Sequence, residues 1–156
     1  MNTQIPLRFS KRSFDLVAIA ILFIVLSAIP AQAKNAADLL EMAGTKGGLI
    51  VHLGCRDGEL TAALRTGDQY FVHGLDTDVD KVAAARKRIM DRGFYGPVSA
   101  DKWDGRHLPY VDNLVNLVVA EESELISKLE LFRVLAPRGV ALIREQGKWS
   151  KIVKLR

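Results

Sequence analysis

The amino-acid sequence predicts an α/β fold, with a doubly wound, mostly parallel sheet of about five strands. Short apolar segments alternate with helix-like segments from residue 36 to residue 146. Such alternation is typical of parallel strands joined by right-handed crossover helices. One segment, residues 114–120, is apolar nearly throughout. This pattern is expected of a strand that helices cover on both faces.

Five segments are predicted strands, because each is short, apolar and bounded by turn-forming residues. They are residues 49–53, 70–75, 97–100, 114–120 and 140–143. The basic tail, residues 147–156, is compatible with a last strand, a linker or a frayed end. We expect the folded domain to span residues 36–146, with the tail outside it.

Four segments are predicted helices, with a capping residue before each apolar stripe and a breaker after it. In the third, Val79, Val82, Ala83, Ile89 and Met90 are expected to share one face. The helices end near residues 42, 65, 93 and 135, and the expected N-caps are Asn35 or Asp38 for the first, Thr77 or Asp78 for the third and Ser123 for the fourth.

The first 33 residues are typical of a secretory signal peptide. Basic residues at 8, 11 and 12 precede an apolar stretch from Leu16 to Ile29, and Ala31-Gln32-Ala33 follows. The apolar stretch has 14 residues, fewer than the roughly 20 that a spanning helix needs. We therefore expect cleavage after Ala33 and an exported protein, periplasmic or secreted. The alternative is a membrane anchor through residues 14–29.

Composition excludes several functional classes. The formal net charge is +4 and falls to about +2 without residues 1–33. The sequence has no run of basic residues that would indicate a nucleic-acid-binding surface. Cys55 is the single cysteine, so no internal disulfide forms. The three histidines have no metal-site spacing, and no metal is expected. A small-molecule ligand fits these properties better.

The loop after the first predicted strand is the candidate ligand site, since doubly wound sheets bind ligands beyond the carboxyl ends of their strands. Gly54 and Gly58 allow a sharp turn and a close approach of a ligand. The loop has two glycines, whereas the dinucleotide fingerprint has three. Asp76, at the end of the second strand, is placed to accept hydrogen bonds from a ribose. Its alternative reading is a turn or cap residue.

Five segments together resemble the class I S-adenosylmethionine-dependent methyltransferases. Residues 50–60, Ile-Val-His-Leu-Gly-Cys-Arg-Asp-Gly-Glu-Leu, resemble the first motif of that family. Residues 74–78 resemble the second motif, and an acidic residue near position 101 resembles the third. Residues 108–119 and 132–139 resemble the segments around the fourth strand and before the fifth. The resemblance spans about residues 39–145 and implies a Rossmann-like fold.

The resemblance implies S-adenosyl-L-methionine as the cofactor and a set of cofactor-binding residues. In this family a carboxylate such as Asp76 binds ribose, and Asp101, with Asp104 as the alternative, lies near adenine. The set is Leu53, Gly54, Cys55, Arg56, Gly58, Asp76, Thr77, Asp101 and Trp103.

The sequence departs from the family pattern at three positions. His52 stands where the family has an acidic residue that helps to hold the cofactor's amino group. Arg56 replaces the central glycine of the loop, and Asn116 replaces an aspartate of the fourth strand. The last two strands of the family's seven-stranded sheet are also expected to be missing, which leaves the fifth strand as an exposed edge open to self-association or a partner.

Two functions follow from the resemblance. The first is a methyltransferase domain, of full, reduced or no activity. The second is an exported non-catalytic binding or interaction module, because similar modules precede a pyrroloquinoline-quinone-type β-propeller in exported bacterial proteins and residues 147–154 resemble that junction. No catalytic residue is assigned. Glu121 and Glu122 are placed where the family has substrate-facing residues, but an acidic turn opening a helix explains them as well.

Overall fold

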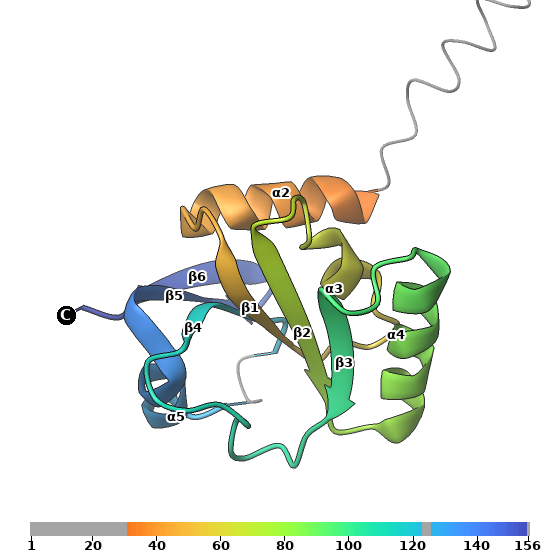
Figure 1. Cartoon of the computed structure of the whole chain (residues 1–156). Coiled ribbons are helices and arrows are strands. Elements are labelled where there is room, and N and C mark those ends of the chain that lie inside the picture. The colour runs from red at the N-terminus through yellow and green to blue at the C-terminus, as the bar shows by residue number, and fades with distance from the viewer. Residues whose placement is uncertain (1–30, 123–125, 156) are drawn as a thin grey trace, which may run out of the picture. The chain divides into compact units, whose positions relative to one another are not determined.

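The computed structural model describes residues 31–122 and 126–155, and Figure 1 shows their arrangement. Helices and strands alternate along this part of the chain. The helices are α2 (Ala31–Ala43), α3 (Glu59–Ala63), α4 (Val79–Asp91) and α5 (Lys128–Val134). The strands are β1 (Gly48–Leu53), β2 (Tyr70–Asp76), β3 (Val98–Lys102), β4 (Val115–Ala120), β5 (Leu135–Glu145) and β6 (Lys148–Val153).

The strands form a single sheet in the order β3-β2-β1-β4-β5-β6. β1 pairs in parallel with both β2 and β4, and the parallel pairing continues to β3 on one side and β5 on the other. β6 runs antiparallel along β5. The mostly parallel α/β sheet predicted from the sequence is therefore confirmed.

Helices cover both faces of this sheet. α2, α3 and α4 lie over one face, where Leu39 of α2 and Ile89 of α4 share a buried cluster with Ile50 of β1. α5 lies over the other face, where Leu131 shares a second cluster with Val51. Neighbouring residues of a strand point to opposite faces, so β1 and β4 contribute to both clusters. This explains the nearly continuous apolar composition of the segment 114–120.

The sheet has one more strand than expected. The tail forms β6, and the expectation that β5 is an exposed edge is wrong, because β5 pairs with β4 and β6. Gln146 and Gly147 both have positive φ, 49° and 81°, which is the requirement of a tight two-residue hairpin turn. Trp149 and Ile152 then pack against opposite cores.

Helix boundaries differ from the expectations in two places. α2 already includes Ala31, so Asn35 and Asp38 lie inside the helix and do not cap it. The expected cleavage point after Ala33 falls within the same helix. α5 is capped by Ser127, whose hydroxyl accepts a hydrogen bond from the Glu130 amide; Ser123 lies outside the described residues. Asp78 is confirmed as the cap of α4.

The buried face of α4 is narrower than its apolar pattern suggests. Val82, Ala85 and Ile89 are buried, whereas Val79 and Met90 are 61% and 56% exposed; Ala83 is exposed as well. The small residue Ala85 packs directly under Gly58. Close approach to the loop after β1 therefore accounts for the burial of Ala85, and Ile89 is buried in the cluster with the sheet.

Residues 1–30, which make up most of the expected signal peptide, lie outside the described part of the chain. Within residues 31–122 and 126–155, no helix is both long and apolar enough to cross a membrane.

We expect Gly58→Ala to lower the free energy of unfolding by about 1–3 kcal/mol more than Gly44→Ala. Both glycines have positive φ, 77° and 72°. A Cβ at Gly58 would lie 2.7 Å from the Ala85 Cα, whereas a Cβ at Gly44 would meet nothing within 4 Å. Urea denaturation of the two variants measures the difference. Equal losses would show that the contact between the loop and α4 is not tight.

Candidate functional site

The candidate site lies where the strand order reverses. β1 lies between β2 and β4, so the connections after β1 and β4 leave the sheet in opposite directions and open a crevice at its carboxyl edge. A cavity of about 170 Å³ lies in this crevice. Its wall combines the loop after β1, the start of α3 and the end of β4: His52, Gly54, Cys55, Arg56, Asp57, Glu59, Leu60 and Glu121.

Backbone hydrogen bonds fix the loop after β1 against the end of β2. The amides of Gly54 and Cys55 both donate to the Leu75 carbonyl, at 2.8 and 3.2 Å. The Arg56 amide donates to the Asp76 carboxylate at 3.1 Å. Arg56 has φ of 48°, a left-handed conformation that costs a non-glycine residue about 1–2 kcal/mol. Arg56 therefore has a backbone conformation that is usual for glycine, although it is not a glycine.

Asp76 is the buried carboxylate of this edge, with 5% of its surface exposed. One of its oxygens accepts the Arg56 amide and the other accepts the Asp78 amide, each at 3.1 Å. The side chain therefore joins the loop after β1 to the turn that starts α4. The sequence predicted that Asp76 binds a ribose, with a turn residue as the alternative. The structure shows the hydrogen bonds of a turn residue.

His52 is a fully buried polar residue of the cavity wall, with 1% of its surface exposed. Its Nδ1 lies 2.8 Å from the Thr61 hydroxyl. Its Nε2 has no hydrogen-bond partner among the described residues. Burial, helped by the positive charge of Arg56 and opposed by Asp76, lowers the pKa of His52 to about 4. The ring is therefore neutral at physiological pH.

Arg56 connects the loop after β1 to the end of β4. Its guanidinium lies 3.2 Å from the Glu121 carboxylate and 3.1 Å from that of Glu122. The Arg56 side chain is 55% exposed and that of Glu121 is 15% exposed. Exposed ion pairs contribute little to stability. These ion pairs hold the Arg56 guanidinium at the cavity, between the loop after β1 and the end of β4.

The other acidic residues of the cavity wall are also paired. Arg88 of α4 contacts the Asp57 carboxylate at 3.1 Å and that of Glu59 at 2.5 Å. Arg92 forms a second ion pair with Glu59. Glu59, Asp57 and Glu121 therefore each have an arginine partner within the protein.

Residues 50–139 match the family model described as a methyltransferase domain. This match covers more than half of the chain. The chain belongs to the methyltransferase domain family.

Known proteins similar to this methyltransferase domain are longer than the chain. The demethylmenaquinone methyltransferase of Lactobacillus johnsonii is 29% identical over 119 residues, which cover 70% of this chain and 48% of that relative. The chain thus spans about half the length of this curated relative.

Two solved structures show the same fold. A proposed S-adenosyl-L-methionine-dependent methyltransferase from Methanococcus maripaludis aligns with a TM-score of 0.67 and 20% identity, over 95% of this chain and 69% of that one. A geranyl diphosphate C-methyltransferase from Streptomyces coelicolor A3(2), in complex with S-adenosyl-L-homocysteine, aligns with a TM-score of 0.63 and 18% identity, over 71% and 43%.

The domain brings some of the sequence-predicted site residues together and separates others. Gly54, Cys55 and Arg56 line the cavity, whereas Leu53 lies in the core beneath α5. Thr77 and Trp103 lie next to Asp76, and Gly58 packs on Ala85 of α4. Thr77 is exposed directly after β2, and the Trp103 amide donates to the Asp76 carbonyl at 2.9 Å.

Asp101 and Trp103 have partners of their own on the far side of β2. The Asp101 carboxylate pairs with Arg86 of α4 and lies 3.0 Å from His73 Nε2. His73 Nδ1 in turn lies 2.7 Å from the Tyr110 hydroxyl. The Trp103 side chain is buried, and its indole donates to the His107 carbonyl at 2.7 Å. Asp104, the alternative to Asp101, accepts the amides of Arg106 and His107 within its own turn.

Cys55 is not a nucleophile in this arrangement. Its side chain is buried, and burial followed by the charge of Asp76 raises the pKa of the thiol to about 12. The thiol therefore stays protonated at physiological pH. A metal site is also absent from residues 31–122 and 126–155, which hold no suitable group of histidine, cysteine or acidic side chains.

Sequence reasoning missed Thr61, His73 and Tyr110. The first shares a hydrogen bond with His52, and the other two extend from Asp101. The available pattern was a histidine within an apolar strand, at buried His52 and half-buried His73. A polar side chain in such a position needs a hydrogen-bond partner. The identity of that partner depends on the packing of the helices and loops on the sheet.

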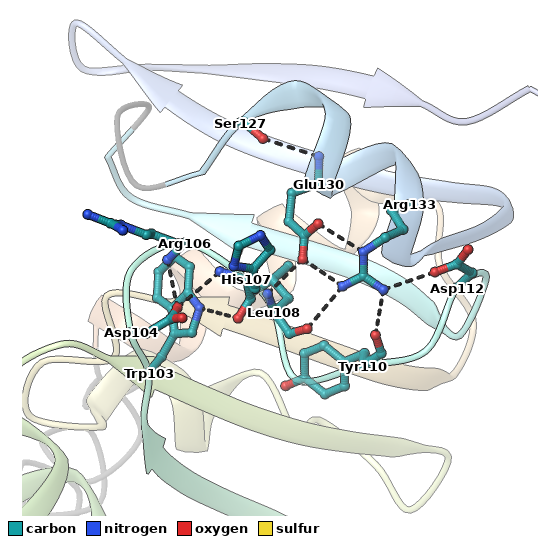
Figure 2. A network of polar contacts seen from close by, with 10 residues as sticks. All are labelled: Trp103, Asp104, Arg106, His107, Leu108, Tyr110, Asp112, Ser127, Glu130 and Arg133. Carbon is teal, nitrogen blue, oxygen red and sulfur yellow. Dashed lines mark hydrogen bonds and ion pairs between the residues drawn. The ribbon is translucent and has the colours of Figure 1, made fainter.

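A polar network holds the long connection between β3 and β4 against α5, as Figure 2 shows. The Arg133 guanidinium donates to the carbonyls of Leu108 and Tyr110, at 3.0 and 2.7 Å. It also contacts the carboxylates of Glu130 and Asp112. Glu130 accepts the Leu108 amide at 2.7 Å, and hydrogen bonding to Arg133 holds the pKa of Glu130 below its usual range. The network fixes the loop that follows Trp103.

We expect the domain to lose stability between pH 7 and pH 4 partly through His52. The neutral ring is favoured in the fold, so its contribution is complete above the unfolded pKa of about 6.5 and is lost as the pH falls towards about 4. The expected loss is about 3 kcal/mol of the free energy of unfolding. His52→Asn should remove this part of the pH dependence, and denaturation at several pH values measures it. Exposed His107→Asn is the control, and identical pH profiles for wild type and His52→Asn would contradict the prediction.

We expect Arg133→Lys to speed amide hydrogen exchange in residues 108–114. A lysine cannot reproduce the planar set of donors that contacts two carbonyls and two carboxylates. The melting temperature should fall as well, because Glu130 loses its partner. Arg106→Lys is the matched control, since the Arg106 side chain points away from the network in Figure 2. Unchanged exchange in Arg133→Lys would show that the loop is held by other contacts.

Proposed function

We propose that this methyltransferase domain binds an S-adenosyl nucleoside in the crevice beyond β1, β2 and β4, and that its methyl-transfer activity is reduced. Asp76 gives the strongest support. It is a buried carboxylate at the end of β2, and it accepts the amide of Arg56 in the loop that shapes the cavity. A ribose-binding group and the adjacent ligand cavity are thus held together by one hydrogen bond.

The residues present fit such a nucleoside. A carboxylate has more lone pairs than the two backbone amides at Asp76 use, so Asp76 retains capacity to accept ribose hydroxyls. Gly54 and Gly58, with φ of 78° and 77°, shape the loop for a close approach. His52 lines the same cavity, and its buried Nε2 has no hydrogen-bond partner among the described residues.

S-adenosyl-L-methionine, when bound, supplies a methyl group that the sulfonium charge activates. The domain's own contribution would be to bind and orient this group, and orientation alone accelerates transfer to a suitable acceptor. Asp76 and the loop 54–58 would hold the nucleoside, with Thr77 and Trp103 beside them. Asp101 is committed to Arg86 and His73 and would contribute by positioning β3.

Arg56 supports the reduced activity. Its guanidinium lies between Glu121 and Glu122 at the cavity. A positively charged methyl donor that approaches this loop meets a like charge, and like charges at close range repel. The Asp57 and Glu59 carboxylates near the same loop have Arg88 as their partner. S-adenosyl-L-homocysteine, which has no sulfonium charge, avoids the repulsion.

Calorimetric titration tests the proposal. We expect wild type to bind S-adenosyl-L-homocysteine in the micromolar range and S-adenosyl-L-methionine more weakly. Asp76→Asn should weaken both by about tenfold or more, the equivalent of one hydrogen bond to a charged group. Arg56→Gly should raise the affinity for S-adenosyl-L-methionine relative to that for S-adenosyl-L-homocysteine. The control is Asp91→Asn, an exposed carboxylate of α4 that pairs with Lys87, and absence of binding at millimolar ligand would overturn the proposal.

A second candidate function is an exported non-catalytic binding module that associates with a quinoprotein-type β-propeller. The leader-like composition of residues 1–33 and the paired carboxylates of the cavity support it. An exported domain would be separated from a cytoplasmic supply of methyl donor. N-terminal sequencing of the protein from its native host distinguishes the two: a chain that begins after Ala33 in the exported fraction supports the module, and an intact leader in the cytoplasm contradicts it.

A further inference from the structure

The His52 ring lies in the wall of the cavity, and its tautomer follows from the contact with Thr61. The buried Thr61 hydroxyl contacts Nδ1 at 2.8 Å, and it has no other hydrogen bond within the described residues. A buried hydroxyl hydrogen without an acceptor is costly, so we assign the Thr61 hydroxyl as the donor to Nδ1. In a neutral imidazole the other nitrogen then carries the proton. Nε2–H is therefore a donor without an acceptor in the described part of the protein.

Arg56 adds further donors to the same wall. A guanidinium has more N–H groups than its contacts with Glu121 and Glu122 use. The carboxylates of the wall, by contrast, are already in ion pairs. Glu121 pairs with Arg56, and both Asp57 and Glu59 pair with Arg88. The cavity thus offers N–H donors to a ligand and holds its carboxylates in ion pairs.

We infer that this cavity binds a hydrogen-bond-accepting group of the ligand, of the carboxylate type, through His52 and Arg56, and that it selects against an ammonium group. The inference rests on the proposed nucleoside binding and specifies which derivative the domain prefers. His52 and Arg56 are then specificity-determining residues. The cavity of about 170 Å³ is smaller than the roughly 300–1,000 Å³ of whole-ligand sites, which suits one end of a ligand.

Four nucleosides that differ at one end separate the contributions of the two charged groups. S-adenosyl-L-homocysteine carries both an ammonium and a carboxylate. Its desamino analogue keeps only the carboxylate, and its decarboxylated analogue keeps only the ammonium. 5′-Methylthioadenosine has neither group. We expect the desamino analogue to bind at least about tenfold more tightly than the decarboxylated one, which is the worth of one hydrogen bond to a charged group. The uncharged 5′-methylthioadenosine should bind between them.

Variants assign the preference to the two residues. Arg56→Gln and His52→Phe should each reduce the ratio of the two affinities towards one. Arg106→Gln and His107→Phe, both exposed and outside the cavity, are the matched controls. Arg56→Gln leaves the buried histidine in place, so the test stands if His52→Phe does not fold. A shift of the His52 ring nitrogen resonances on addition of the desamino analogue gives a second, direct readout.

The outcomes separate this inference from the proposed function. Binding of 5′-methylthioadenosine together with equal or tighter binding of the decarboxylated analogue overturns the inference and leaves nucleoside binding in place. A preference for the carboxylate that both variants retain also overturns it, because other residues would then be responsible. No binding of any of the four overturns the proposed function and the inference with it.

Discussion

The position of β1 between β2 and β4 is the constraint on which the rest of the domain depends. Ile50, Val51 and Leu53 are completely buried, because β1 pairs with a strand on each side and is covered on both faces. Its carboxyl end is therefore fixed in the middle of the sheet. The loop that follows has to leave the sheet at the point where the strand order reverses. The cavity, Asp76 and the end of β4 all lie around this loop.

Two glycine-dependent features hold that loop close to its surroundings. Gly58 packs on Ala85 of α4, and Gly74 leaves room for Cys55 and Thr61, since a Cβ at Gly74 would lie 2.8 Å from the Cys55 Cβ. The second contact places Thr61 beneath β1, where it meets His52. The loop approaches α4 and β2 closely at these two glycines. This approach determines both how the loop packs and which polar side chains lie at the cavity. The charge of Arg56 acts on a site whose shape is set by these contacts.

The site differs from the family pattern in charge more than in shape. The loop keeps positive φ at Gly54, Arg56 and Gly58, and Asp76 keeps its place at the end of β2. Against the family pattern that the sequence resemblance implies, His52 is a neutral buried ring in place of an acidic residue, and Arg56 is a guanidinium in place of a glycine. Shape explains why the fold is retained at 18–20% identity to the two solved structures. Charge is the property through which ligand preference and activity would change.

The sequence by itself determined the α/β class, the five parallel strands, a helix cap at Thr77 or Asp78 and the loop 54–58. Hydrophobic periodicity, capping residues and glycines act over a few neighbouring residues, so they can be recognised in the sequence. Only the tertiary structure decided that the tail pairs as β6, and that Arg56 contacts Glu122, 66 positions away. It also decided the contacts of His52 with Thr61 and of Asp101 with His73. These contacts form where strand ends and helix faces meet, and local patterns do not encode which distant side chains meet there.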